Sequence, residues 1–191
     1  MKKLNRSLVI IVCLLLININ VYSQSYTLSK ANSSITVSGT SSLHDWDVVS
    51  NSFNGKIQIK DITTGQLESL EVYIASESLK SGKNAMDKKT YKALKTDEYK
   101  NIKFKMVEVK SNKKIDDSTY EMRLVGEMTI CGETKMKTID FLLSKTGNAL
   151  NATGSCAMKM TDFKIEPPTA LLGAITTGDD ITIKFNANFK N

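Results

Sequence analysis

The sequence predicts an all-β protein, an extended antiparallel barrel of about eight strands with one short helix. Apolar and polar residues alternate with a period of two through most of the chain, and helical periodicity is confined to one short segment. Each expected strand is apolar on one face only, which is typical of antiparallel sheets. Because a single domain with so many long strands must protect its sheet edges, we expect closure into a barrel, with a β-sandwich as the alternative.

The clearest strands are expected in the C-terminal half of the chain. Apolar and polar side chains alternate there in residues 120–130, 135–144, 150–160 and 181–190. Gly132 and the pair Gly147 and Asn148 lie between these stretches and are typical turn residues. The pattern therefore predicts a meander of long strands.

The N-terminal half is expected to form shorter strands. Their apolar centres are residues 35–37, 46–48, 57–59, 70–74 and 102–106. In the last of these, Ile102, Phe104 and Met106 share a face, but Val107 and Val109 continue on the other face. This switch predicts either a strand that is covered on both faces or a β-bulge near Met106.

Two segments depart from the strand pattern. Residues 84–94 carry spaced apolar side chains among good helix formers, which predicts a short amphipathic helix capped by Asn84. It would lie across one side or one end of the sheet. Residues 161–178 show no periodicity and contain both prolines of the chain. A loop of this length is usually functional or serves as a lid.

The first residues predict export. A basic start precedes an apolar run over residues 7–17 that is too short to span a bilayer comfortably. We expect a signal peptide over residues 1–23 and one mature domain over residues 24–191, in the periplasm or outside the cell. A lipoprotein signal ending at Cys13 is disfavoured, because Val12 stands where lipid attachment requires a small residue.

The charge of the chain is partly a property of its first residues. The chain has 26 basic and 20 acidic residues, but three of the basic residues lie in the predicted signal peptide. The remaining lysines are interspersed with acidic residues, so we expect no nucleic-acid partner. No later run is long and apolar enough to cross a membrane. The oligomeric state stays open between a monomer and a homodimer.

Few residues are available for catalysis. His44 is the only histidine, and Cys131 and Cys156 are the only cysteines after the signal peptide. These are too few for a zinc site of the usual nitrogen and sulfur ligands. The chain contains no nucleophile elbow, phosphate-binding loop or dinucleotide fingerprint. We therefore expect no metal, no cofactor and no catalytic residue, and a protein that is not an enzyme.

Cys131 and Cys156 have two interpretations. Paired in an oxidising compartment, they would stabilise the fold by ~3 kcal/mol. Two separate thiols are the favoured interpretation, because Cys131 lies beside the turn residue Gly132 whereas Cys156 lies within an expected strand.

The inward face of the expected sheet indicates a ligand. It is rich in methionine, which adapts to irregular apolar surfaces. Gly126, Ala152 and Gly154 share its parity, where small residues would leave volume for a ligand; bends in long strands would also explain the glycines. Trp46 would stack on an apolar chain and His44 would meet a polar head group. A core tryptophan beside a surface histidine explains this pair equally well.

Short segments with distinctive residues follow one another in a fixed order: residues 26–28, 44–46, 53–57, 86–87, 102–104, 126–130, 160–165 and 178–179. In this order and spacing the chain resembles the YceI-like family of lipid- and polyisoprenoid-binding proteins, across essentially all of the mature region.

The resemblance implies a lipocalin-like barrel, exported to the periplasm, that encloses a long isoprenoid chain. By similarity, the ligand would contact Trp46, Phe104, Met122, Leu124, Met128, Met158 and Phe163. The residue pattern itself adds Gly126 and His44 to these candidates.

Three functions are consistent with these observations. The first is a periplasmic binding or carrier protein for a polyisoprenoid or a similar long amphiphilic lipid. The second is a structural or interaction domain of the cell envelope with a filled core. The third is an isomerase or cyclase, which would require at least two polar groups converging on an internal cavity. A long internal cavity would favour the first function over the second.

Overall fold

The computed structural model describes residues 23–191. The predicted signal peptide lies almost entirely outside this range. The strands are β1 (Gln24–Ser41), β2 (Trp46–Ser50), β3 (Phe53–Asp61), β4 (Gln66–Ala75), β5 (Asn101–Lys114), β6 (Thr119–Ile130), β7 (Glu133–Thr146), β8 (Ala149–Lys159), β9 (Thr169–Ala170) and β10 (Ile175–Lys190). The helices are α2 (Asn84–Ala93) and the 3-10 turns η1 (Ser76–Ser78), η2 (Met160–Phe163) and η3 (Leu171–Gly173).

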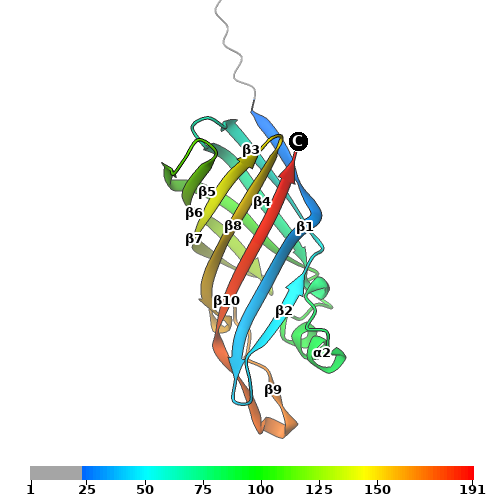
Figure 1. Ribbon diagram of the computed structural model, residues 1–191. Coiled ribbons are helices and arrows are strands. Elements are labelled where there is room, and N and C mark those ends of the chain that lie inside the picture. The colour runs from blue at the N-terminus through cyan, green and yellow to red at the C-terminus, as the bar shows by residue number, and fades with distance from the viewer. Residues whose placement is uncertain (1–22) are drawn as a thin grey trace, which may run out of the picture.

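The strands form a closed antiparallel barrel, as the sequence predicts, and not a sandwich. Neighbouring strands pair in the order β1, β3, β4, β5, β6, β7, β8 and β10, and β10 pairs back onto β1 to close the barrel. Two short strands add to this ring: β2 pairs with β1 over residues 35–39, and β9 pairs with the first two residues of β10. Figure 1 shows β2, α2 and β9 together in one half of an elongated barrel, with the C-terminus at the opposite end. We call these the α2 end and the C-terminal end.

The period-two pattern buries one face of each long strand. In β6, Tyr120, Met122, Leu124, Gly126, Met128 and Ile130 are all buried, and the residues between them face outward. The C-terminal end is solidly packed, because fully buried side chains from several strands meet there: Ile57, Ile59, Met122, Leu143 and Leu150. The larger cavity of the barrel lies toward the other end.

Bulges in β5 and β1 allow these long strands to follow the curvature of the barrel. In β5, Met106 pairs with Gly126 and Glu108 with Val125, so Val107 is the extra residue and its side chain is 54% exposed. This confirms the predicted bulge near Met106. In β1, Asn32 has a φ of 63° and interrupts the register with β10.

The buried hydroxyl of Ser33 forms hydrogen bonds in place of backbone hydrogen bonds that are lost at the β1 bulge. Its Oγ accepts a hydrogen bond from the Asn188 amide at 2.9 Å and donates one to the Ser29 carbonyl at 2.6 Å. A serine side chain thus replaces a ladder hydrogen bond that the extra residues of β1 between Ser29 and Ser34 remove.

The predicted helix forms as α2, but its start differs from the prediction. Lys83, not Asn84, is the capping residue, and no side chain caps the helix. Asn84 is already helical. The carboxylate of buried Asp87 instead accepts hydrogen bonds from the amide and hydroxyl of Ser81, at 2.7 and 2.6 Å, and so fixes the chain that leads into the helix. These hydrogen bonds between Asp87 and Ser81 take the place of the cap that was expected from Asn84.

The segment predicted as a long loop, residues 161–178, is more ordered than expected. η2 buries Met160 and Phe163, β9 pairs with the start of β10, and β10 begins at Ile175, six residues before the predicted strand. The start of this strand was not predicted because apolar and polar residues do not alternate there. Consecutive polar residues occupy both faces at Thr176–Thr177 and Asp179–Asp180. Within residues 23–191, no helix has both the length and the apolar character needed to cross a bilayer.

Candidate ligand-binding cavity

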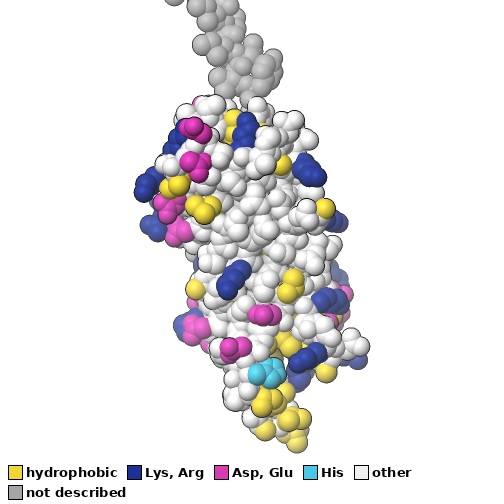
Figure 2. Space-filling view, in the orientation of Figure 1, with side chains coloured by type: hydrophobic (Ala, Val, Ile, Leu, Met, Phe, Trp, Pro, Cys, Tyr) yellow, Lys and Arg dark blue, Asp and Glu magenta, His cyan; other side chains and the backbone are white. Residues whose placement is uncertain are grey.

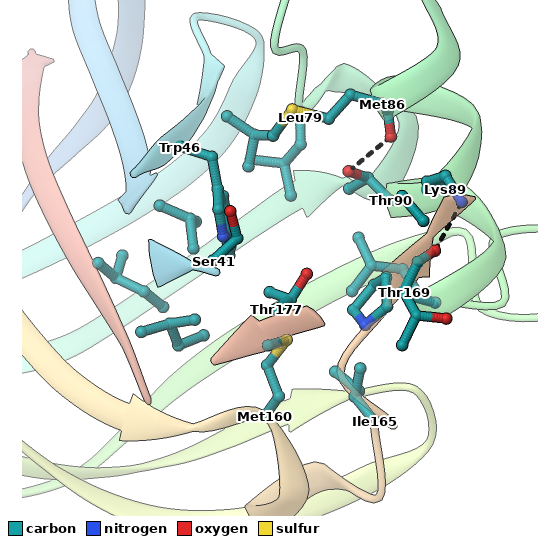
Figure 3. Close-up of a pocket in the computed structure, with 18 of the residues that line it drawn as sticks. Ser41, Trp46, Leu79, Met86, Lys89, Thr90, Met160, Ile165, Thr169 and Thr177 are labelled. Carbon is teal, nitrogen blue, oxygen red and sulfur yellow. Dashed lines mark hydrogen bonds between the residues drawn. The ribbon is translucent and has the colours of Figure 1, made fainter. Parts of the chain in front are cut away.

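An apolar cavity of 310 Å³ lies at the α2 end of the barrel. Most of its wall is aliphatic and comes from strands far apart in the sequence: Ile35, Val37, Val48, Ile74, Ile102, Ile130, Ile181 and Ile183. Figure 3 shows its polar lining residues, among them Ser41, Lys89, Thr90, Thr169 and Thr177. A wall of this composition suits a hydrocarbon chain with a small polar group.

Helix α2 covers one side of the cavity. Ala85, Met86, Lys89, Thr90 and Ala93 line it from one face of the helix, because residues three or four apart in a helix point the same way. The hydroxyl of Thr90 donates a hydrogen bond to the Met86 carbonyl at 3.2 Å and is satisfied within the helix.

The segment before β10 covers the opposite side. It contributes Ile165, Pro168, Thr169 and Ala170 to the wall. The Nζ atom of Lys89 donates a hydrogen bond to the Thr169 carbonyl at 2.7 Å, which links this cover to α2 across the opening (Figure 3). The two covers are therefore joined by a single hydrogen bond from an exposed lysine.

Trp46 is held in one orientation against the cavity. Its Nε1 atom donates a hydrogen bond to the Thr40 carbonyl at 2.9 Å, and its ring lies over Gly39. A Cβ atom at position 39 would stand only 2.3 Å from Cζ2 of the ring, so the close approach requires glycine. The indole thus presents an apolar face to the cavity with its polar atom satisfied.

His44 lies at the rim, in the exposed loop between β1 and β2. Its Nδ1 atom is 2.7 Å from the Asp45 carbonyl oxygen, and its own carbonyl accepts a hydrogen bond from the Ser41 hydroxyl at 2.7 Å. The imidazole is therefore oriented by its own loop and faces solvent as well as the cavity.

A second, smaller cavity of 100 Å³ lies deeper in the barrel. Phe104, Leu124 and Met128 line it, together with aromatic residues of β3, β7 and β10. Four isoleucines line both cavities and form the partition between them: Ile35, Ile74, Ile102 and Ile183. The apolar space thus continues from the α2 end toward the middle of the barrel, interrupted by these four aliphatic side chains.

The comparisons with known proteins agree with this architecture. Residues 26–189 match the YceI-like domain. The chain belongs to the YceI-like family. No curated protein sequence matches it.

Solved structures of similar shape come from several bacteria. BcnA of Burkholderia cenocepacia has a TM-score of 0.70 at 15% identity, covering 84% of this chain and 98% of BcnA. A polyisoprenoid-binding domain from Saccharophagus degradans, implicated in plant cell wall breakdown, has a TM-score of 0.67 at 10% identity, covering 86% and 97%. The YceI protein of Campylobacter jejuni has a TM-score of 0.58 at 20% identity, covering 73% and 81%. At these identities the likeness concerns the fold.

In this YceI-like barrel the predicted ligand contacts fall into three groups. Trp46 and His44 line the larger cavity, and Phe104, Leu124 and Met128 line the smaller one. The other candidates are buried in the core and line neither cavity: Met122, Gly126, Met158 and Phe163.

The volume expected beside the inward glycines is filled by aromatic rings. A Cβ atom on Gly126 would stand 2.4 Å from Cζ of Phe104, and one on Gly154 would stand 2.7 Å from both Phe141 and Phe185. Phe141 and Phe185 themselves pack with ring centroids 6.3 Å apart. The glycines therefore admit phenylalanine rings to the core, and the prediction that they leave space for the ligand is wrong. Ala152 does line the smaller cavity.

Sequence reasoning placed the helix across one side or end of the sheet and took residues 161–178 for a functional loop or a lid, but it named none of the residues by which these two covers line the larger cavity. The helical spacing of Ala85, Met86, Lys89 and Ala93 was a usable signal for the face of α2 that lines it. The segment before β10 carries no such signal, because its contacts arise from the way the loop folds back onto the barrel.

The two cysteines lie in different surroundings, and both are free thiols in the described part of the chain. Cys131 sits in the turn between β6 and β7, with a φ of 50° and its Sγ 3.2 Å from the Leu94 carbonyl. Cys156 is buried in β8. Burial raises the pKa of each thiol, so both are protonated and unreactive at neutral pH.

An ion pair fastens η2, which follows β8, to β7. The Nζ atom of Lys137 lies 2.5 Å from a carboxylate oxygen of Asp162 and 5.5 Å from the ring centroid of Phe163. The hydrogen bond from Lys137, and then that from the Lys159 amide, hold the pKa of Asp162 below its ordinary value of 3.8. Because the pKa is lowered in the folded state, this carboxylate stabilises the fold above the ordinary carboxyl pKa, and the contribution is lost as the pH falls through the lowered one.

Asp162→Asn should therefore lower the thermal unfolding midpoint at pH 7, and the difference from the wild type should shrink as the pH falls below about 4. Circular dichroism melts of both proteins across this range measure it. Asp97→Asn, at an exposed loop position, controls for the loss of one negative charge. A difference that stays constant down to pH 2 would show that the ion pair is not the cause.

Proposed function

We propose that this chain is a binding or carrier protein, and not an enzyme, that holds a polyisoprenoid or a similar long amphiphilic lipid in the barrel. The observation that carries the proposal is the 310 Å³ apolar cavity at the α2 end. Burial of a hydrocarbon chain contributes about 0.8 kcal/mol per methylene, so it supplies affinity without any catalytic group. The similarity to a polyisoprenoid-binding domain supports the same class of ligand.

The polar residues give the ligand a direction. Lys89, Thr169 and His44 lie at the rim, whereas the deeper cavity is lined almost entirely by apolar side chains. We therefore assign the head group to the rim, within reach of Lys89, and the end of the chain to the isoleucine partition. Modest movement of Ile35 or Ile183 would admit the chain to the smaller cavity.

The hydrogen bonds around the cavity argue against an isomerase or cyclase. The Lys89 ammonium and the Thr90 and Ser41 hydroxyls each donate to backbone carbonyls, rather than pointing together at one position in the cavity (Figure 3). Catalysis of that kind needs polar groups aimed at the reacting atoms. The presence of a cavity likewise argues against the envelope domain with a filled core.

We also propose that the protein acts in the periplasm, after removal of residues 1–23. The basic start and the short apolar run of the sequence support export. Cell fractionation with N-terminal sequencing of the mature protein tests this part separately. A mature chain that begins at Gln24 in the periplasmic fraction is the expected result.

The ligand itself is tested by native mass spectrometry of the protein purified from its own host, followed by lipid extraction. We expect one amphiphile for each chain, with a mass in the isoprenoid or long-chain lipid series. Protein that is repeatedly empty, and that takes up no prenol or fatty amphiphile on addition, would refute the proposal.

A further inference from the structure

The tip of the α2 end exposes leucines. Leu171 and Leu172 in η3 are 74% and 110% exposed, and Leu43 in the neighbouring β1–β2 loop is 66% exposed. Figure 2 shows hydrophobic side chains gathered at this end of the molecule, close to the single histidine. Exposed apolar side chains also occur singly on the barrel wall, as at Leu142, but two adjacent leucines at an apex are a different kind of surface.

These leucines are held outward by a fixed backbone. The two loops are joined because the Ser42 amide donates to the Thr176 carbonyl at 2.9 Å and the Thr176 amide donates to the Ser42 hydroxyl at 3.1 Å. Leu171 and Leu172 have φ values of 48° and 56°, in the left-handed region that favours glycine or asparagine. Leucine is thus unfavourable here both for its conformation and for its exposure, and the described part of the chain leaves Leu172 fully exposed.

The tip adjoins the cavity directly. Leu43 itself lines the larger cavity, and so do Thr169, Ala170 and Ile175 on either side of η3. An apolar molecule that reached the tip would therefore meet the cavity wall within a few residues.

The shape and charge of this end favour a lipid surface over a protein partner. A stable protein interface buries about 800 Å² on each partner, whereas this tip is a narrow projection beyond the barrel (Figure 1). Beside it, α2 exposes Lys88, Lys89 and Lys92, while Asp87 is buried against Ser81; in the β1–β2 loop, Asp45 is the exposed acidic residue. Exposed leucines flanked by lysines bind bilayers that contain anionic lipids.

We propose that Leu171 and Leu172 insert into an anionic lipid bilayer, and that the lysines of α2 hold the open end of the barrel against it. The inference rests on the proposed function, because it identifies the membrane as the place from which the lipid ligand is taken or to which it is delivered. The bilayer contact places the rim of the cavity at the level of the lipid head groups.

The test is sedimentation of the protein with vesicles of phosphatidylglycerol and phosphatidylethanolamine. Leu171→Asn/Leu172→Asn should reduce the bound fraction by about tenfold or more at the same lipid concentration. Asparagine adopts the left-handed conformation readily, so this variant should fold at least as well as the wild type. Leu142→Thr, on the outer wall, is the matched control and should bind as the wild type does. Added salt should weaken binding of the wild type.

Equal sedimentation of the wild type and the tip variant would overturn the proposal, as would a wild type that binds no vesicles. A dimer that the tip variant converts to a monomer would also overturn it, because a second copy of the chain would then cover the leucines. Lipid uptake from ethanol solution separates this inference from the proposed function. The tip variant should take up a prenol from ethanol normally and lose uptake from vesicles, whereas failure of both in the wild type would refute the ligand itself.

Discussion

Thr177→Trp should displace the lipid from the barrel while the protein stays folded. Thr177 lies in β10 and its side chain lines the larger cavity (Figure 3). An indole at this position would occupy space otherwise filled by about three methylenes of the ligand. At about 0.8 kcal/mol each, the loss is roughly 2 to 3 kcal/mol, or about fiftyfold in the dissociation constant.

Titration with a fluorescent prenol measures this loss, and a urea titration checks the fold. Thr182→Trp is the matched control, because Thr182 lies in the same strand between Ile181 and Ile183, which line the cavity, and so points to the other face. Unchanged affinity in Thr177→Trp would show that the ligand does not occupy this cavity.

Phe163→Ala should lower the free energy of unfolding by about 3 to 5 kcal/mol. Phe163 is 1% exposed in η2 and packs in the core, and its ring faces the ammonium of Lys137. It lines neither cavity, so its truncation should leave the affinity of the folded protein for lipid unchanged. The family resemblance alone leads to the opposite expectation, a loss of affinity.

Chemical denaturation gives the unfolding free energy, and lipid titration at low temperature gives the affinity of the folded fraction. Phe163→Leu retains most of the buried volume and should cost clearly less than the alanine variant. A large loss of affinity with normal stability would mean that Phe163 contacts the ligand and that the cavity extends beyond its present walls.

Much of the fold could be predicted because, in a strand with one buried face, apolar and polar residues alternate along the sequence. β6 is the clearest example, since every residue that alternation assigns inward is buried. The bulge at Val107 was also predictable, because an extra residue reverses the parity of the pattern. The β10 start was not, because polar residues occupy both faces where the strand leaves the core.

The site was less predictable because a cavity forms where side chains from different strands do not fill the space between them. The sequence pattern does not show which side chains these are. Alternation places Gly126 and Gly154 on the inward face, where a missing side chain would leave space for a ligand. Rings from neighbouring strands fill that space. Whether a ring fills the space beside each glycine depends on how β5, β7 and β10 are aligned with the strands that carry the glycines. Trp46 was predictable as a wall residue. Ile165 lines the cavity through the folding of an irregular segment, and Thr177 lies in the first part of β10, where apolar and polar residues do not alternate.

We propose that a lipid chain lies in the larger cavity with its tail at the isoleucine partition. Photocrosslinking with a prenol that carries a diazirine at the end of its chain tests this most directly. We expect labelled peptides that contain Ile35, Ile74, Ile102 or Ile183, and loss of the label in Thr177→Trp. Label found only on the outer wall of the barrel, for example at Leu142, would contradict it.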